Sequence, residues 1–206
     1  MKDHLKKAIR VFKKKRGLLR TGEALDLGIH PRSLWVLKEE GVIEKLDRGI
    51  YQLSDEFNFS EPDLILVSKM VPQGVVCLVS ALSYYNLTTQ VPHFVYVALK
   101  SGSRRPQVKY PPTRFFWYSD IAFKCGIVTE VIDGHPVQIY CVEKTLADCV
   151  KFRNKIGMDV VLEALKLYCK RKKMDLDKLL KFAKICRVEK ILNPILETIL
   201  NLCVPI

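Results

Sequence analysis

The chain has 206 residues, of which 49% are hydrophobic, and it carries a formal net charge of +12. This length and composition predict a folded, soluble protein of one large domain or two small ones. The best candidate for a membrane span, residues 64–87, is interrupted by Lys69 and Pro72, and the charged amino terminus has no apolar segment behind it. We therefore expect an unprocessed, cytoplasmic protein.

The seven cysteines are spread singly along the chain, without a CxxC pair or a nearby CxH partner. An odd number at such spacings argues against both a disulfide framework and a zinc site. Most of them lie in apolar segments, such as VVCLV around Cys77, where a free cysteine behaves as a small buried hydrophobe. We therefore expect neither a metal ion nor another cofactor.

The positive charge is concentrated at the amino terminus. Residues 1–20 contain nine Lys or Arg residues and one acidic residue, Asp3, which leaves a local charge of +8, whereas residues 54–100 have a local charge of −2. The chain is basic again at residues 170–173. A basic block indicates a polyanionic partner, most often a nucleic acid, and the alternative is a solvated helix face.

The first predicted element is an amphipathic helix. Leu5, Ala8, Ile9 and Phe12 recur at the i, i+3, i+4, i+7 spacing of one helix face, and basic residues occupy the other faces. Gly17 is expected to end this helix, because glycine adopts the positive φ at which many helices stop.

A short extended link and a second helix follow. Residues 18–20 form the link, and Thr21 is the predicted N-cap of a helix over residues 22–27. Gly28 is the predicted C-terminal stop of this second helix.

A third helix is predicted between Pro31 and Gly41. Pro31 suits the first helical position, and Gly41 closes the helix. Leu34 and Leu37 place an apolar edge inward. The side chains predicted to project elsewhere are Arg32, Ser33, Trp35 and Lys38.

A hairpin completes the amino-terminal third. Two short strands, over residues 42–46 and 50–53, flank Asp47-Arg48-Gly49, a composition that permits a tight turn. The order helix, helix, tight turn, helix, hairpin is that of a winged helix-turn-helix domain.

This order assigns the third helix to the major groove of DNA. Arg32 is expected to contact guanine or phosphate, Ser33 either of these, and Lys38 the phosphate backbone. Arg48 at the hairpin tip is expected in the neighbouring minor groove or on its phosphates. Trp35 has two interpretations: it packs against the wing or the first helix, the commoner outcome for such a tryptophan, or it contacts nucleic acid.

A polar junction with proline, DEFNFSEP, spans residues 55–62. It predicts a winged helix-turn-helix domain over residues 1–54, a linker over 55–62 and a larger domain over 63–206. Strands followed by helices indicate an α+β fold for this larger domain, with mixed strands and then a carboxy-terminal helical set. Its predicted strands are 75–79, 94–99, 113–118, 126–132 and 136–140, the last two joined by an Asp133-Gly134 turn. Its predicted helices are 80–87, capped by Ser80, 143–156, 159–171, 175–187 and 189–202, with a kink or restart near Pro194.

The larger domain offers little catalytic chemistry. Glu143 suits the start of a helix, and Asp148 can pair with Lys144 or Arg153, so structural roles are favoured over an acid pair. The Ser-Gly-Ser-Arg-Arg segment at 101–105 is interpreted as a phosphate-binding or merely exposed loop, because no DxD strand motif follows to hold a metal ion. We therefore expect no catalytic residue and no enzyme activity.

Several long segments carry a family resemblance. The amino-terminal one reads GLLRTGEALDLGIHPRSLWVLKEEGVIEKLDRGIYQL. The later ones read SALSYYNLTTQVPHFVYVAL, SGSRRP, YPPTRFFWYS, VEKTLADCVKFRNKIGMDVVLEAL and ICRV. Together, from about Ile9 to the final helix, the chain resembles the AbiEi family of antitoxin-like transcriptional regulators, from the type IV toxin–antitoxin systems of abortive infection.

The resemblance implies two linked functions. The amino-terminal domain would be a sequence-specific DNA-binding autorepressor that binds inverted repeats in the promoter of its own operon. The carboxy-terminal domain would provide antitoxicity in phage defence, against a nucleotidyltransferase-like toxin with which it forms no stable complex. We expect a monomer, or a dimer assembled on double-stranded DNA.

The resemblance also adds Arg20 and Thr21 to the expected operator contacts. The full set of predicted DNA-binding residues is Lys13, Lys14, Lys15, Arg16, Arg20, Thr21, Arg32, Ser33, Trp35, Lys38, Lys45 and Arg48. The implied antitoxicity candidates are Thr88, Thr89, Gln90, Arg104, Arg105, Lys144, Asp148 and Arg153. For these, structural roles are an equal alternative, since residues 88–90 can simply end a helix and Arg153 can simply pair with an acidic residue.

Two other function classes are alternatives. A nuclease-like or nucleotidyltransferase-like enzyme would need a metal-binding acidic cluster, and Asp120, Glu130 and Asp133 make a poor one. A protein-interaction module would use the basic face for an acidic partner and would show no preference for DNA sequence.

Overall fold

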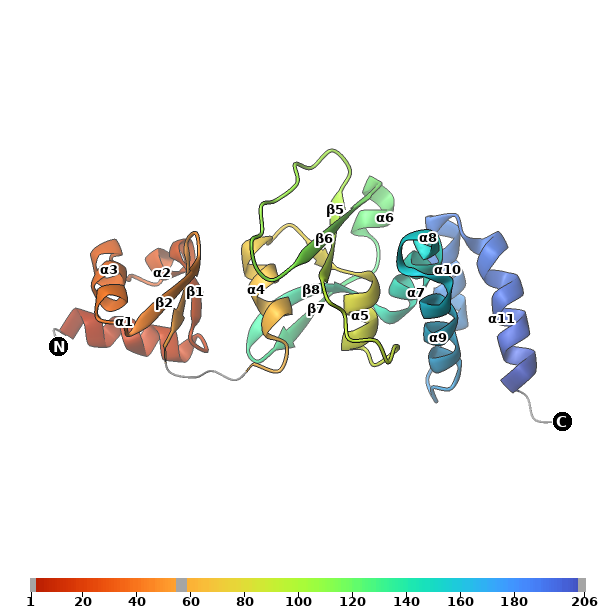
Figure 1. The fold of residues 1–206 in the computed structure, drawn as a ribbon, viewed down its shortest axis with the longest axis horizontal. Helices are drawn as coiled ribbons and strands as arrows, with labels where there is room; N and C mark the ends of the chain where they lie inside the picture. Colours follow the sequence, from red (N-terminus) through yellow and green to blue (C-terminus); the bar gives the residue numbers. More distant parts are fainter. Residues whose placement is uncertain (1–2, 55–58, 204–206) are drawn as a thin grey trace. The chain divides into compact units, whose positions relative to one another are not determined.

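The protein is described by a computed structural model that covers residues 3–54 and 59–203 (Figure 1). The chain forms two compact units. Unit 1 contains residues 1–70 and 131–136, and unit 2 contains residues 71–130 and 137–206. Residues 55–58 of the predicted linker lie outside the described residues, so the boundary predicted there stays a prediction.

Unit 1 begins with a winged helix-turn-helix. Leu5, Ala8 and Phe12 are buried against Leu34 and Leu37, which confirms the predicted apolar faces of the first and third helices. The residues interpreted as an extended link form a strand, β1, which pairs with β3 in a three-stranded antiparallel sheet of order β1-β3-β2. The elements are α1 (Asp3–Lys14), β1 (Leu18–Arg20), α2 (Thr21–Asp26), α3 (Pro31–Glu39), β2 (Ile43–Asp47) and β3 (Ile50–Leu53).

The N-cap of α2 differs from the prediction by one residue. Arg20, not Thr21, is the N-cap, and Thr21 is the first helical residue. Arg20 is paired with Ile50 in the sheet, so it keeps the extended backbone that an N-cap requires. Its N–H donates to the Glu23 carboxylate at 2.8 Å, which satisfies the donor at the start of the helix.

Unit 2 is built on a mixed five-stranded sheet of order β6-β5-β4-β8-β7. The β5–β6 and β4–β8 pairs are parallel and the β4–β5 pair is antiparallel. The strand predicted over residues 113–118 is confirmed without change as β6. The strands are β4 (Val75–Val76), β5 (Val95–Lys100), β6 (Thr113–Tyr118), β7 (Ile127–Ile132) and β8 (His135–Tyr140).

The helix after β4 begins earlier than predicted, so the Ser80 cap is wrong. Helix α5 (Leu78–Tyr84) has Cys77 as its N-cap. Ser80 lies inside the helix and is buried. Its hydroxyl donates to Phe94 O at 3.2 Å and accepts the Tyr96 N–H at 3.0 Å, so it joins the helix to β5 instead of capping it. Two further helices, α4 (Pro62–Met70) in unit 1 and α6 (Asp120–Lys124) in unit 2, were not predicted.

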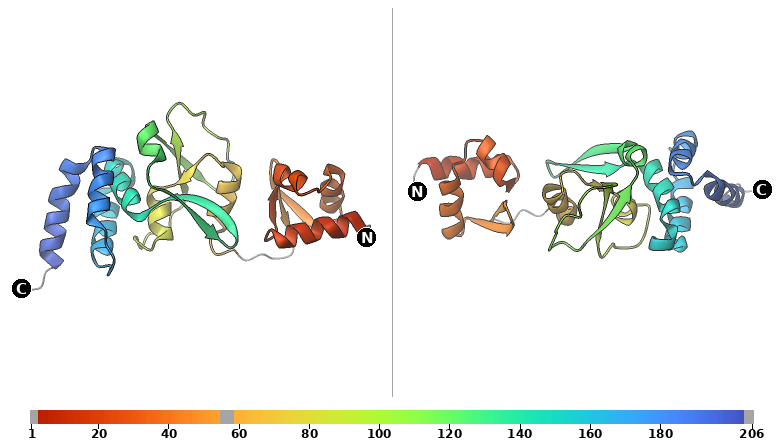
Figure 2. Two further views of the ribbon diagram at one scale, coloured as in Figure 1. Left: turned by 180° about the vertical axis from the view of Figure 1, so that it is seen from behind. Right: turned by 90° about the horizontal axis from the view of Figure 1, so that it is seen from above.

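The carboxy-terminal helices lie together on one side of the unit 2 sheet, in cyan to blue in Figure 2. The helix predicted over residues 143–156 is divided at Phe152. Of the kink or restart predicted near Pro194, the restart is wrong, because α11 continues through Pro194. The apolar faces of these helices close the main core of unit 2. They are α7 (Val142–Lys151), α8 (Arg153–Ile156), α9 (Met158–Cys169), α10 (Leu176–Cys186) and α11 (Glu189–Cys203).

Within the described residues, no helix has the length and apolar character needed to cross a membrane.

Candidate nucleic-acid interface

Helix α3 presents a basic and aromatic outer face. His30 caps the helix, because its Nδ1 accepts the Arg32 N–H at 3.1 Å, and Pro31 occupies the first position as predicted. Arg32 and Lys38 are exposed. Trp35 is 62% exposed, so the interpretation that it packs into the core is wrong. The reason is helical geometry: with Leu34 turned inward, the next residue is rotated by about 100° toward solvent.

Ser33 does not project outward as predicted. It is only 5% exposed, because it lies one turn before Leu37 on the face of α3 that packs inward. It lines a surface groove of about 670 Å³, whose wall also includes His4, His30 and Arg32. Ser33 is therefore removed from the set of outward-facing donors, and the groove brings Arg32 beside the start of α1.

The wing tip is held by the start of α2. The Thr21 N–H donates to Gly49 O at 2.8 Å, and the Thr21 hydroxyl donates to the same oxygen at 3.3 Å. Gly49 has φ +74°, and Asp47 accepts the Arg48 N–H at 2.6 Å, so the turn is fixed on both sides. This arrangement leaves Arg48 and Lys45 exposed. Thr21, expected as an operator contact, has its hydroxyl engaged in positioning the wing.

The basic end of α1 is exposed over residues 13–16. Helix α1 ends at Lys14, three residues before the predicted stop at Gly17. The turn that follows has positive φ at Arg16 and Gly17, and the Gly17 N–H donates to Phe12 O at 2.8 Å. Arg20 is half-buried. Among the described residues, Arg32, Lys45 and Arg48 form no ion pair, whereas Lys38 pairs with Glu39 at 3.1 Å. Most of these cations are therefore available to a polyanion.

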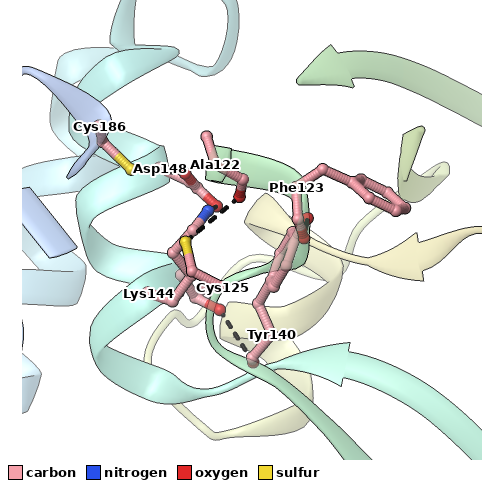
Figure 3. Close-up of polar contacts among 8 residues, drawn as sticks. Ala122, Phe123, Cys125, Tyr140, Lys144, Asp148 and Cys186 are labelled. Atoms are coloured by element: carbon pink, nitrogen blue, oxygen red, sulfur yellow. Dashed lines mark hydrogen bonds and ion pairs between the residues drawn. The ribbon is translucent and has the colours of Figure 1, made fainter. Parts of the chain in front are cut away.

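In unit 2 the antitoxicity candidates Lys144 and Asp148 are inaccessible (Figure 3). Both side chains are fully buried and form an ion pair at 2.5 Å, which confirms the predicted i, i+4 pairing. Asp148 also accepts the Cys186 thiol at 3.2 Å, and the Lys144 ammonium lies 4.2 Å from the centroid of the Tyr140 ring. Burial raises the pKa of Asp148, against the opposing effect of the Lys144 charge. Because neither group reaches the surface, the structure favours the structural alternative for both.

Thr88 and Thr89 bind one carboxylate from helix α9. The Thr88 hydroxyl donates to Glu163 Oε2 at 2.7 Å, and the Thr89 hydroxyl and N–H donate to Oε1 at 2.7 and 3.0 Å. The Gln90 N–H donates to the Thr88 hydroxyl at 3.1 Å. These bonds join the segment after α5 to α9, which supports the structural alternative for residues 88–90.

Replacing Glu163 by glutamine is expected to lower the free energy of unfolding at neutral pH by about 1 kcal/mol, because three donors lose a charged acceptor. Hydrogen bonds from Thr89 and Thr88 lower the pKa of Glu163. A lowered folded-state pKa gives stability that is present above the unfolded-state pKa and is lost as the pH falls through the folded-state pKa. The loss of free energy of unfolding caused by Glu163→Gln, measured by urea unfolding, should therefore be larger at about pH 7 than at about pH 3. The exposed Glu197→Gln is the matched control, and equal costs at both pH values would contradict the prediction.

The remaining predicted residues of unit 2 divide into two groups. The Arg153 guanidinium donates to Val150 O at 3.1 Å, so it caps the end of α7 and does not pair with an acidic residue. Arg104 and Arg105 are exposed, and Arg105 lies 5.9 Å from the centroid of the Phe115 ring. Arg104 and Arg105 therefore keep the accessibility that a binding role requires, as do the exposed Thr89 and Gln90.

Comparison with known proteins bears on the amino-terminal segment. Residues 6–54 match the family model described as "Transcriptional regulator, AbiEi antitoxin". This match confirms the AbiEi resemblance over residues 6–54, and the resemblance of the later segments stays a prediction. The matched residues, here called the AbiEi segment, carry most of α1 together with β1, α2, α3 and the wing. The AbiEi family is one of transcriptional regulators and antitoxins of abortive infection systems.

The whole fold has a counterpart among solved structures. The RV2827C protein from Mycobacterium tuberculosis is similar to this chain with a TM-score of 0.53 and 12% sequence identity. The similarity covers 96% of this chain and 82% of that one. At this identity the likeness concerns the fold alone, and it supports the α+β architecture of this chain. No curated protein matches the sequence.

The acidic residues of the enzyme alternative have structural partners. Asp120 pairs with Lys100 at 2.7 Å and with Lys124 at 3.0 Å. Asp133 accepts the Ser60 N–H at 2.7 Å and its hydroxyl at 2.9 Å. Across residues 3–54 and 59–203, no group of three or more His, Cys, Asp or Glu side chains is placed to hold a metal ion. The family model that residues 6–54 match describes a transcriptional regulator and antitoxin.

Sequence reasoning missed one group of functional candidates, on β6 of unit 2. Arg114, Phe115 and Trp117 line a surface pocket together with Arg105 and Lys155. A signal was present in the sequence, because residues 100–119 contain five basic residues and no acidic one, interleaved with aromatic residues. The pattern TRFFWY indicated only a strand, and the strand's position at the sheet edge was needed to see a site.

Proposed function

We propose that this protein is a sequence-specific DNA-binding transcriptional autorepressor, which acts also as the antitoxin of a type IV toxin–antitoxin operon in phage defence. The observation that carries the proposal is the exposed face of α3, where Arg32, Trp35 and Lys38 point to solvent. This helix belongs to the winged helix-turn-helix formed by the AbiEi segment. Side chains of this kind on a third helix of this topology suit the major groove.

The wing and α1 would add affinity without sequence preference. Arg48 sits at the tip of a hairpin that Thr21 anchors, so it can reach a minor groove or its phosphates without ordering a flexible loop. Residues 13–16 supply four further cations for phosphates. Each neutralised phosphate would contribute about −0.9 to the slope of log K against log salt concentration.

The finer features of the proposal follow the family. The operator would consist of inverted repeats in the promoter of the protein's own operon, each bound by one copy, so the protein would be a monomer or a dimer assembled on DNA. The functional partner would be a nucleotidyltransferase-like toxin, opposed without a stable complex. Antitoxicity would reside in unit 2, through its accessible side chains and not through Lys144 or Asp148.

A footprint of the purified full-length chain on the DNA upstream of its own gene tests the proposal. Titrations at two salt concentrations should show protection of paired repeats, with an affinity that falls steeply as salt rises. The spacing of the protected repeats would give the half-site separation. Uniform weak protection along the DNA, with no paired sites, would overturn the repressor function and leave the basic face as a non-specific patch.

A further inference from the structure

Strand β6 lies at the edge of the unit 2 sheet (Figure 1). It carries a pocket that the proposed operator binding does not use. The pocket has a volume of about 270 Å³. This is close to the lower end, about 300 Å³, of pockets that hold small ligands, so it has room for one planar group. Its lining residues are Arg105, Arg114, Phe115, Phe116, Trp117 and Lys155.

The pocket combines aromatic rings with cations. Trp117 is 42% exposed, whereas Phe116 is buried and forms the floor. The Arg105 guanidinium lies 5.9 Å from the centroid of the Phe115 ring, and the Lys155 ammonium lies 5.6 Å from that of Phe116.

The loop that brings Arg105 to the pocket is held in place. The Trp117 indole N–H donates to Ser103 O at 3.0 Å, and the Ser101 N–H donates to Tyr118 O at 2.7 Å. The loop after β5 is therefore tied to β6 at two points, Ser101 and Ser103, shortly before Arg105 in the chain.

The charges of the pocket are not neutralised. In the part of the chain that the structure describes, none of Arg105, Arg114 and Lys155 forms an ion pair with a carboxylate. Asp120, two residues after the end of β6, is already engaged by Lys100 and Lys124. The pocket therefore has a net positive charge and suits an anionic ligand with a planar group.

We propose that this pocket binds an unpaired nucleotide, with its base stacked on Phe115 and Trp117 and its phosphate held by Arg105, Arg114 and Lys155. Aromatic platforms beside cations are the means by which proteins bind single-stranded nucleic acid with little sequence preference. The ligand is either a free nucleotide or one residue of a single strand, because both offer the same base and phosphate. Double-stranded DNA does not fit, since its bases are stacked on one another.

The fluorescence of Trp117 tests the proposal directly. The chain has two tryptophans, so Trp35→Phe leaves Trp117 as the only one, on a background that does not disturb unit 2. Uridine monophosphate, a short single-stranded oligouridylate and a duplex of random sequence are the three probes. Quenching by the oligouridylate alone would identify a single strand as the source, and equal quenching by the monophosphate would identify a free nucleotide. Quenching by neither, or stronger quenching by the duplex, would overturn the proposal.

A matched pair of variants assigns the effect to the pocket. Arg105→Ala with Lys155→Ala removes two exposed pocket cations and should weaken binding at least about tenfold. Lys166→Ala with Lys181→Ala removes the same amount of charge from exposed positions elsewhere in unit 2 and should change the affinity for the probe little. Equal affinities of the two double variants would overturn the proposal. If the pocket variant does not fold, as judged by thermal unfolding, Phe115→Leu removes one stacking ring and should also weaken binding several-fold.

The operator footprint separates this site from the proposed repressor function. The pocket variant should protect the promoter repeats as the native chain does, because the AbiEi segment is unchanged. Loss of nucleotide binding with an intact footprint would support both proposals. A native chain that quenches with oligouridylate but gives no footprint would support the pocket alone.

Discussion

Replacing Lys144 by methionine is expected to lower the free energy of unfolding of unit 2 by about 3–5 kcal/mol. Methionine keeps the length and apolar stem of lysine, so the variant isolates the charge. It leaves Asp148 fully buried with only the Cys186 thiol as a partner and removes the cation from the Tyr118 and Tyr140 rings. The loss should appear as a lower midpoint in urea unfolding, without a change in the slope.

The matched control removes both charges. Lys144→Met combined with Asp148→Leu should recover most of the lost stability, because replacing a buried ion pair by apolar residues of similar volume is often neutral or stabilising. A double variant as unstable as the single one would contradict this account of the pair. It would indicate that the packing of the Lys144 side chain against Gly126 contributes more to stability than its charge does. The two residues are in close contact, because a Cβ added at Gly126 would lie only 2.7 Å from the Cβ of Lys144.

Replacing Arg32 by alanine is expected to weaken binding to the proposed operator by about 1–3 kcal/mol, which is about 5- to 150-fold. The side chain is exposed, and its backbone bond to His30 remains, so the stability of unit 1 should not change. If Arg32 reads a base, the loss should be confined to one position of the site and should vanish on DNA already altered there. Titrations on native and single-base-substituted operators measure both effects.

Lys14→Ala is the matched control for Arg32. A lysine at the exposed end of α1 would contact phosphates only, so its loss should weaken binding to all sequences alike and reduce the salt slope by about 1. Operator binding by Arg32→Ala that equals native binding would show that α3 does not lie in the major groove. A uniform loss with both variants would assign Arg32 to the phosphate backbone.

Local signals were enough to predict the winged helix-turn-helix. The spacing of Leu5, Ala8 and Phe12, the proline at the start of α3 and the glycine of the wing each act through a few neighbouring residues, so the sequence contains them directly. The exposure of Arg32 and Arg48 was predicted for the same reason. Ser33 was misplaced because its burial depends on which face of α3 the rest of unit 1 covers, and that face is wider than the two leucines indicated.

In unit 2 the sequence predicted most strands and helices but not their neighbours. The order β6-β5-β4-β8-β7 joins strands that are distant in the chain, and hydrophobic pattern carries no record of which strand pairs with which. The role of Ser80 and the pocket beside Trp117 could not be predicted for the same reason. Ser80 bonds to Tyr96 on another element, and the pocket is lined by residues from separate parts of the chain.

The sequence alone therefore determined most of the element types and the basic character of the amino terminus, and it offered the ion pair of Asp148 with Lys144 as one of two pairings. Each of these features depends on residues close together in the chain. The burial of that ion pair, the anchoring of the wing by Thr21 and the position of β6 at the sheet edge were decided by tertiary packing, which brings together groups that no local pattern relates.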